Sequence, residues 1–216
     1  MSKLLVLYGA TGATGSHILR MALEDGLRVR AYVRSPDKIP AELREHSALE
    51  VSQGDFTDAD GVQAALEGAD MVICAGGGPV GFQKGLMMGV VTNLIAGMRT
   101  HGVKRLVYQA GAFSPAPGTQ NPLFVRWVLR PILGTIFGIS AMLAENDEVM
   151  AYVAGEARDL NWTFTRPGQI VEEPSKGKLN VSDKMSTKCH FVDLARLNLD
   201  LVQSDEQIHQ FPYVDY

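Results

Sequence analysis

The stretch GATGATG (residues 9–15) places three glycines at intervals of three, directly after the apolar run LLVLY (residues 4–8). A turn between a buried strand and a helix can bring backbone N–H groups and the positive end of the helix dipole to a phosphate, provided that no side chain blocks the approach. Gly9 then permits the tight turn, Gly12 admits the phosphate, and Gly15 lets the helix pack against the strand. The spacing therefore predicts a site for the pyrophosphate of a dinucleotide.

Two threonines in the same turn, Thr11 and Thr14, can donate hydroxyl hydrogen bonds to phosphate oxygens. A P-loop is excluded, because no Gly-Lys-Ser or Gly-Lys-Thr sequence follows the glycines. The remaining alternative is a tight turn that holds no ligand. The position of the motif, between a strand and a helix at the start of an alternating chain, favours the dinucleotide site.

The residues after the second strand indicate which dinucleotide binds. NAD-binding chains usually place an acidic residue there, about 20 residues on from the glycines, to hold the ribose hydroxyls. Here the strand RVRAYV (residues 28–33) is followed by Arg34, with Ser35 and Lys38 beside it. A guanidinium suits a 2′-phosphate, and a lysine adds positive charge where an acid would repel the ligand. The sequence predicts NADP(H) in preference to NAD(H), and the alternative is a solvated arginine.

Two later strand ends add candidate contacts to the cofactor. Asp55 and Phe56 end the third predicted strand at the same sheet edge and are expected on the adenine side. Ala75, Gly76 and Gly77 end the fourth strand, where a glycine loop can lie against the ribose and nicotinamide.

The elements that must position these residues alternate between strand and helix. Short apolar strands are predicted at residues 4–8, 28–33, 48–55, 70–78, 104–113 and 161–168, and helices at 16–25, 58–66, 85–101 and 141–159. Because the strands are apolar on both faces, helices must cover both sides of the sheet. We predict the α/β class, with a Rossmann-type doubly wound parallel sheet in one NAD(P)-binding domain over residues 1–216.

One segment interrupts the alternation, a small substrate-side insertion at about 112–140. Residues 114–122 have loop chemistry, and residues 123–139 are strongly apolar but too short and too charged for a good membrane span. The plain interpretation is a partly buried helix pair. The functional interpretations are a lid over an apolar substrate, a surface for a homodimer or protein partner, and, last, contact with a membrane surface.

Composition limits the remaining classes of function. The net charge of −4 argues against a binder of duplex nucleic acid, whereas a nucleotide needs only one or two local cations. Cys74 and Cys189 form no disulfide framework, and Cys74 is expected to be a small buried hydrophobe. The histidines lack metal-ligand spacing, so no metal site is predicted. The first apolar run lacks the features of a signal peptide, so a cytoplasmic location is expected.

Together these motifs resemble the atypical short-chain dehydrogenase/reductase group, and within it the flavin reductase/biliverdin reductase B and NmrA-like NAD(P)-binding proteins. The likeness covers nearly the whole chain and rests on the segments GATGATG, VRSPDK, GDFTD, HGVKRLVYQAGAF, LNWTFTRPGQI and FVDLARLNLDLV. The resemblance implies that the first motif holds the pyrophosphate, that the arginine after the second strand holds the 2′-phosphate, and that the backbone after Arg166 flanks the nicotinamide. The complete predicted cofactor site is Gly9, Thr11, Gly12, Ala13, Thr14, Gly15, Arg34, Ser35, Lys38, Asp55, Phe56, Ala75, Gly76, Gly77 and Pro167.

The catalytic motifs of that group do not carry over to this chain. Short-chain dehydrogenases generally use Tyr-x-x-x-Lys, in which the lysine lowers the pKa of a tyrosine acid. Tyr152 is instead followed four residues later by Glu156. The serine and histidine of the flavin reductase family correspond here to Gly111 and a position near Glu148. The catalytic residues are therefore unknown, and the conceivable substitutes are Ser114, Glu145, Glu148 and Tyr152.

Two functions fit these observations. The first is an NADPH-dependent reductase that passes hydride to a planar acceptor such as a flavin or quinone, whose reduced ring can take its proton from solvent. The second is a non-catalytic NAD(P)(H) sensor of the NmrA-like type, which would present residues 112–140 to a partner. An epimerase or dehydratase of nucleotide sugars ranks below both, because it needs Tyr-x-x-x-Lys. In the reductase, one wall of the acceptor pocket would comprise Leu123, Phe124, Trp127 and Phe137.

Overall fold

The computed structural model describes residues 2–76, 83–136, 138–185 and 188–216. Its strands are β1 (Leu4–Tyr8), β2 (Arg28–Val33), β3 (Leu49–Gln53), β4 (Met71–Cys74), β5 (Arg105–Gln109), β6 (Asn161–Pro167), β7 (Gln169–Val171), β8 (Asn180–Ser182), β9 (Lys188–His190) and β10 (Tyr213–Asp215). Its helices are α1 (Ala13–Glu24), α2 (Ala41–Arg44), α3 (Ala59–Ala64), α4 (Leu86–His101), α5 (Arg130–Ile136), α6 (Ser140–Glu156) and α7 (Phe191–Val202), with a 3₁₀ turn η1 (Pro36–Lys38) and a π-helix η2 (Val125–Leu129).

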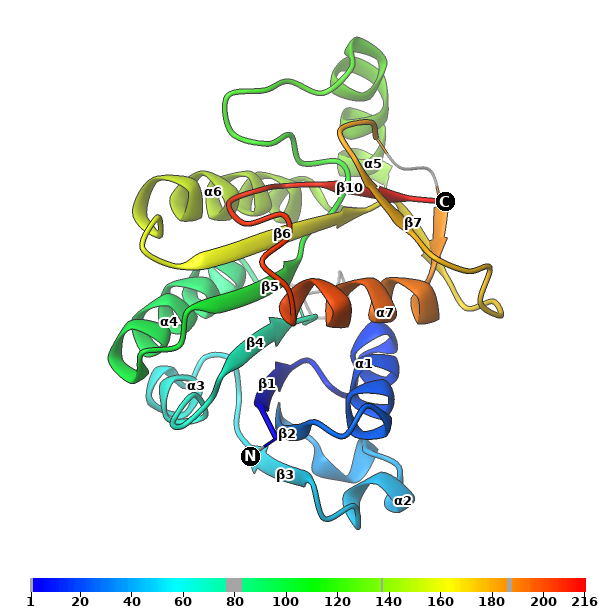
Figure 1. Cartoon of the computed structure of the whole chain (residues 1–216). Helices are drawn as coiled ribbons and strands as arrows, with labels where there is room; N and C mark the ends of the chain where they lie inside the picture. The colour runs from blue at the N-terminus through cyan, green and yellow to red at the C-terminus, as the bar shows by residue number, and fades with distance from the viewer. Residues whose placement is uncertain (1, 77–82, 137, 186–187) are drawn as a thin grey trace.

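These elements form the predicted Rossmann-type α/β fold (Figure 1). The main sheet has the strand order β3-β2-β1-β4-β5-β6-β10-β8 and is parallel except for the pair β10 and β8. The six predicted strands are all present, although those predicted to reach residues 78 and 113 end at Cys74 and Gln109. The sequence interpretation did not specify the strands after β6, which extend the sheet beyond that strand.

The central strands are apolar throughout because helices pack on both of their faces. In β1, Leu5 and Leu7 belong to the core cluster that includes α1 and α7, whereas Val6 and Tyr8 belong to the one that includes α3, α4 and α6. Figure 1 shows the same two layers of helices on either side of the sheet. Each fully buried large apolar side chain contributes about 1.5–3 kcal/mol to folding.

The order in which successive strands are added to the sheet reverses at β1. The chain first adds β2 and β3 on one side of β1, and then β4, β5 and β6 on the other. In open α/β sheets, ligands bind outside the carboxyl ends of the strands at such a switch point. The glycine turn after β1 therefore lies where a dinucleotide site is expected.

The insertion differs from the expected helix pair, because residues 123–136 form one continuous helical stretch that contains η2 and α5. We call it the insertion helix. Val125 and Gly134 are buried in it, and Arg130 pairs with Asp147 of α6 at 2.7 Å. Its large exposed apolar side chains are Leu123, Phe124, Trp127, Val128, Ile132 and Ile136.

Within the described part of the chain, no helix is both long enough and apolar enough to cross a membrane. The insertion helix ends at residue 136, and Phe137 lies outside the described residues.

Candidate cofactor-binding site

The glycine turn after β1 has a backbone that tolerates no side chain at its critical positions. Gly9 has φ +85°, and a Cβ atom there would lie 2.6 Å from the backbone nitrogen of Gly76. A Cβ atom on Gly15 would overlap the carbonyl oxygen of Gly9. The turn is closed by the Gly12 N–H, which donates to the Gly9 carbonyl at 2.9 Å. These contacts give the physical reason for glycine at positions 9 and 15, whereas a Cβ atom on Gly12 would meet only the Gly9 carbonyl oxygen, at 3.3 Å.

The same turn opens the amino terminus of α1 to an anion. Gly12 is the N-cap, and no side chain in the described residues caps the helix. Thr11, Gly12 and Ala13 are exposed, whereas Thr14 is buried. The first N–H groups of a helix have no intrahelical partner, and the helix dipole favours negative charge beside them. This turn can therefore hold a phosphate group mainly through backbone N–H groups.

Arg34 directly follows β2 and extends into solvent, with 76% of its side chain exposed. Its Nε lies 3.7 Å from Oδ2 of Asp55, a loose contact that leaves most guanidinium donors available. Ser35 is half-buried, and Lys38 is exposed in η1. Arg34 and Lys38 thus place two cations at the carboxyl end of β2, beside the carboxylates of Asp37 in η1 and of Asp55.

Asp55 is held in place by its own loop. Its Oδ1 accepts hydrogen bonds from the backbone N–H of Thr57 at 2.9 Å and from the Thr57 hydroxyl at 2.8 Å. These two bonds, with the nearby charge of Arg34, lower the pKa of Asp55 below its ordinary value. Asp55 is therefore an ionised acceptor at neutral pH.

The loops after β3 and β4 contact each other at the same edge. The ring of Phe56 packs so closely on Gly76 that a Cβ atom there would lie 2.7 Å from it. The Ala75 N–H donates to the carbonyl of Tyr8 at the end of β1. The structure thus brings together the predicted residues that follow β1, β3 and β4. Gly77 lies outside the described residues.

Pro167 ends β6, farther along the same carboxyl edge. It is buried, and its carbonyl accepts a hydrogen bond from Ala112 at 3.0 Å. This bond joins the loop after β5 to the end of β6.

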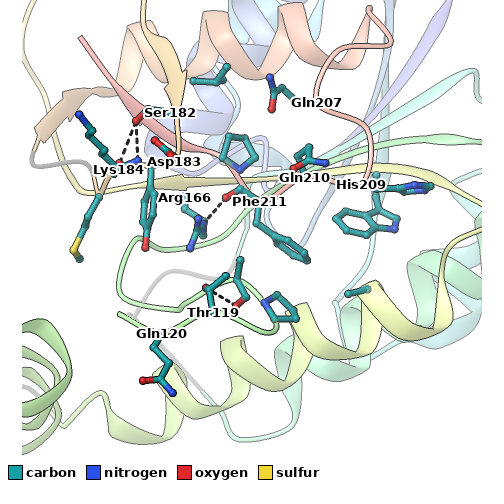
Figure 2. Close-up of a pocket in the computed structure, with 18 of the residues that line it drawn as sticks. Thr119, Gln120, Arg166, Ser182, Asp183, Lys184, Gln207, His209, Gln210 and Phe211 are labelled. Carbon is teal, nitrogen blue, oxygen red and sulfur yellow. Dashed lines mark hydrogen bonds between the residues drawn. The ribbon is translucent and has the colours of Figure 1, made fainter. Parts of the chain in front are cut away.

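A groove of about 1200 Å³ lies beside β6, between the loop of residues 116–122 and the strands β10 and β8 (Figure 2). Arg166 lies in it with only 5% of its surface exposed. The Arg166 guanidinium donates to the carbonyls of Phe211 and Ser114 at 2.7 and 3.0 Å, and it stacks 3.6 Å from the centre of the Tyr213 ring. Leu123, Phe124 and Trp127, the expected wall of an acceptor pocket, are absent from its described lining and point into solvent.

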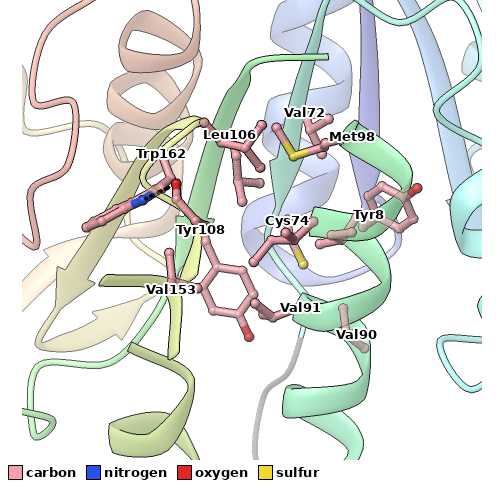
Figure 3. Close-up of a cluster of buried hydrophobic side chains, with 14 of the residues drawn as sticks. Tyr8, Val72, Cys74, Val90, Val91, Met98, Leu106, Tyr108, Val153 and Trp162 are labelled. Atoms are coloured by element: carbon pink, nitrogen blue, oxygen red, sulfur yellow. Dashed lines mark hydrogen bonds between the residues drawn. The ribbon is translucent and has the colours of Figure 1, made fainter. Parts of the chain in front are cut away.

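Cys74 has the structural role expected from the sequence. It is fully buried, and burial raises the pKa of its thiol to about 12, so the thiolate is not available as a nucleophile. Figure 3 shows it among apolar side chains that include Val72 and Tyr108. The described residues also contain no group of three histidine, cysteine or acidic side chains that could hold a metal ion.

Glu145, one of the conceivable proton donors, is a helix cap. Its side chain is buried and accepts hydrogen bonds from the backbone N–H groups of Gly85 and Met88, both at 2.9 Å. Those N–H groups belong to the first turn of α4, where a carboxylate is favourable. The role of Glu145 in the structure is therefore to join α6 to the start of α4.

Tyr152 and Glu148 are also poorly placed for catalysis. Glu145 of α6 contacts the start of α4, and Arg99 in the last turn of α4 donates to the carbonyl of Glu156 at the end of α6. The two helices therefore run side by side in the same direction. Tyr152, two turns beyond Glu145, therefore lies toward the amino edge of the sheet. Glu148 is exposed on the surface of α6.

Two other polar side chains, from the loop after β5 and from α6, are buried. Ser114 is fully buried, and its hydroxyl has no partner among the described residues. Asn146 is also buried, with an Oδ1 atom that no described group satisfies. The sequence interpretation missed Asn146, although its neighbours at helical spacing, Leu143, Val149 and Met150, mark it as a polar residue on an apolar face.

Comparisons with known proteins agree with this geometry. A family model described as NAD(P)H-binding matches residues 9–205. A chloroplastic, uncharacterized protein of Arabidopsis thaliana is 27% identical over 82% of this chain and 63% of its own length, so the chain spans less than two thirds of that relative. Oxidoreductase stcQ of Emericella nidulans is 26% identical, over 92% of this chain and 76% of its own length.

Among solved structures, ChuY, an anaerobillin reductase of Escherichia coli O157:H7, superposes with a TM-score of 0.76. It is 20% identical, and the match covers 99% of this chain and 97% of that one. At this identity the likeness supports the fold alone.

Proposed function

The chain belongs to the NAD(P)H-binding family, among the atypical short-chain dehydrogenase/reductase and NmrA-like proteins that its motifs resemble, and from this premise we propose that it is an NADPH-dependent reductase. Its acceptor would be a planar, apolar molecule such as a flavin or quinone. The observation that carries the proposal is the exposed Arg34 guanidinium, at the same sheet edge as the glycine turn. An arginine fork there binds a 2′-phosphate, which NADPH has and NADH lacks.

In this proposal the pyrophosphate lies at the turn of Gly9, Gly12 and Gly15, and the start of α1 supplies N–H donors. Asp55 and Phe56 border the adenine, while Ala75, Gly76 and Pro167 border the nicotinamide. NADPH, when bound, supplies the hydride. The remaining contacts to the cofactor are proposed for Thr11, Ala13, Thr14, Ser35, Lys38 and Gly77.

In this proposal the chain's own residues orient the cofactor and the acceptor and shield them from water, and they transfer no proton. Glu145 is occupied as a helix cap, and Tyr152 lies toward the opposite edge. A reduced flavin or quinone ring can collect its proton from water, so the absence of a strong acid is compatible with hydride transfer. The groove beside β6, which Arg166 lines, is the proposed entry for the acceptor.

The test is NADPH oxidation by the purified protein with a panel of flavins and quinones, with NADPH binding confirmed on the same sample. We expect turnover above the protein-free rate, and a slower rate with NADH. Tight NADPH binding with no turnover by any acceptor in the panel would contradict the reductase and favour the second candidate.

That second candidate is a non-catalytic NADP(H) sensor, and the structural occupation of Glu145 is the observation that favours it. The sensor would bind the cofactor at the same residues and contact a protein partner, or a second copy, through residues 112–140. Its signature is a change in protease sensitivity of that segment on NADPH addition, without consumption of the cofactor.

A further inference from the structure

The insertion helix carries a concentration of apolar surface that no part of the described chain covers. Every large apolar side chain that is exposed in the described residues belongs to it: Leu123, Phe124, Trp127, Val128, Ile132 and Ile136. Trp127 is 67% exposed, and Leu123 is 73% exposed. Six such side chains present on the order of 600 Å² of apolar surface, the upper end of what a monomer shows as its largest patch. An exposed apolar surface of this size indicates an interaction site.

The charge around the helix restricts what that partner can be. Residues 114–144 contain two arginines and neither Asp nor Glu, although the chain has 24 acidic residues and a net charge of −4. Arg130 is paired with Asp147, whereas Arg126 is exposed, with its guanidinium 5.2 Å from the centre of the Trp127 ring. The exposed helix is therefore apolar with a positive charge, complementary to an apolar surface bordered by negative charge.

A second copy of the chain fits this helix less well than a lipid surface does. A twofold dimer places the same patch on both subunits, so the cation Arg126 would recur on both sides without an acidic partner in the segment. Protein interfaces normally surround their apolar core with a mixed polar rim. Tryptophan, phenylalanine and leucine beside arginine are typical of helices that lie in the interface of a bilayer.

We propose that the insertion helix docks on the surface of an anionic lipid bilayer, with its axis in the membrane plane. Leu123, Phe124 and Trp127 enter the boundary between headgroups and acyl chains, and Arg126 remains at the level of the phosphates. Arg126 also donates to Gln120, which lines the groove beside β6, at 2.6 Å. Docking therefore brings the rim of the groove toward the lipid. The proposal does not depend on which reaction the protein catalyses.

The chain contains its own reporter for this docking. It has two tryptophans, of which Trp162 is buried and Trp127 is exposed. Titration of the full chain with vesicles of phosphatidylcholine plus phosphatidylglycerol should shift the tryptophan emission to shorter wavelength, and the protein should sediment with the vesicles. Vesicles of phosphatidylcholine alone should bind at least several-fold less protein, and added salt should weaken binding to the anionic ones.

The decisive variant is Leu123→Asp combined with Phe124→Asp, which leaves Trp127 in place as the reporter. Both side chains are exposed, so the fold should persist while vesicle binding falls by at least tenfold. The control is Ala41→Asp, which adds negative charge at an exposed position of α2 and should leave binding unchanged.

Three results would overturn the proposal: no sedimentation with anionic vesicles, equal binding to both kinds of vesicle, or a concentration-dependent dimer that the double variant dissolves. The last result would assign the helix to a second copy of the chain. NADPH affinity, measured on the same double variant, should equal that of the wild type, so a failure of the cofactor site would be recognised separately.

Discussion

The glycine turn after β1 and the insertion helix differ in how strongly the fold restricts the residue type at each position. In the turn, a Cβ atom on Gly9 or Gly15 would collide with backbone atoms, so the residue type follows from the path of the chain. In the insertion helix, most side chains point into solvent, and buried contacts such as that of Val125 are few. The first region needs its sequence in order to fold, whereas the second carries exposed apolar residues that its own fold does not require.

The two regions therefore carry different kinds of information about function. A residue that the fold does not need, yet that costs solubility, must be explained by something outside the fold. A residue that the fold does need can be explained by geometry alone, and its functional role requires a separate experiment. Substitutions at the glycine turn, at Arg34 and at Glu145 separate these two kinds of requirement.

The largest effect is expected from Gly15→Ala, because the added methyl group overlaps the Gly9 carbonyl and displaces the turn from α1. Overpacking of this kind costs about 1–3 kcal/mol, and we expect the Kd for NADPH to rise by about 100-fold. Isothermal titration measures it. The matched control is Gly155→Ala, an exposed site in α6 with open space around it, where binding should stay unchanged and stability should rise slightly.

If Gly15→Ala bound NADPH as tightly as the wild type, the glycine turn would be a structural feature only. The turn and the insertion helix would then both lack a demonstrated ligand.

A smaller and more selective effect is expected from Arg34→Asp. The substitution removes a phosphate partner and adds repulsion, so the Kd for NADPH should rise by about 10–100-fold while that for NADH changes by less than about threefold. Parallel titrations with both cofactors measure the ratio. Arg44→Asp, at an exposed arginine of α2, is the charge-matched control. Equal weakening of both cofactors would contradict the assignment of Arg34 to the 2′-phosphate.

The smallest effect on binding is expected from Glu145→Ala, which tests whether a buried carboxylate serves the fold or the chemistry. Loss of the cap on α4 should lower the free energy of unfolding by about 1–3 kcal/mol, while the Kd for NADPH stays within about twofold. Urea denaturation measures the stability, and the exposed Glu148→Ala on the same helix should be nearly neutral. A stable Glu145→Ala protein that had lost only turnover would show a catalytic role instead.

The sequence predicted the fold around the glycine turn well, because its signals are local, while the cofactor contacts of these residues stay a prediction. Gly9, Gly12 and Gly15 stand within seven residues, and Arg34 directly follows the strand that presents it. The helix predicted to begin at residue 58 is α3, and the carboxylate of its N-cap Asp58 accepts the N–H of Gly61 at 3.0 Å. In each case the signal lies within a few residues of the turn, strand or helix that it identifies.

The contacts of Arg166 and Glu145 could not be predicted in the same way, because they join distant parts of the chain. Arg166 depends on Phe211 and Tyr213, and Glu145 caps a helix that begins about 60 residues earlier in the sequence. No local pattern distinguishes a capping glutamate from a proton donor on the same helix face. The apolar run of residues 123–139 was recognised, but its exposure depends on what the rest of the fold leaves uncovered.

The position of β10 has a consequence for the order in which the protein matures during synthesis. β10 lies between β6 and β8 in the sheet, and residues 211–213 supply two of the contacts that hold Arg166. Because α7 packs on α1 and completes the core over one face of β1, the strands around the glycine turn also wait for residues near the end of the chain. A chain still emerging from the ribosome therefore lacks both the full cover of the turn and the wall beside β6, and the two are expected to form together once synthesis ends.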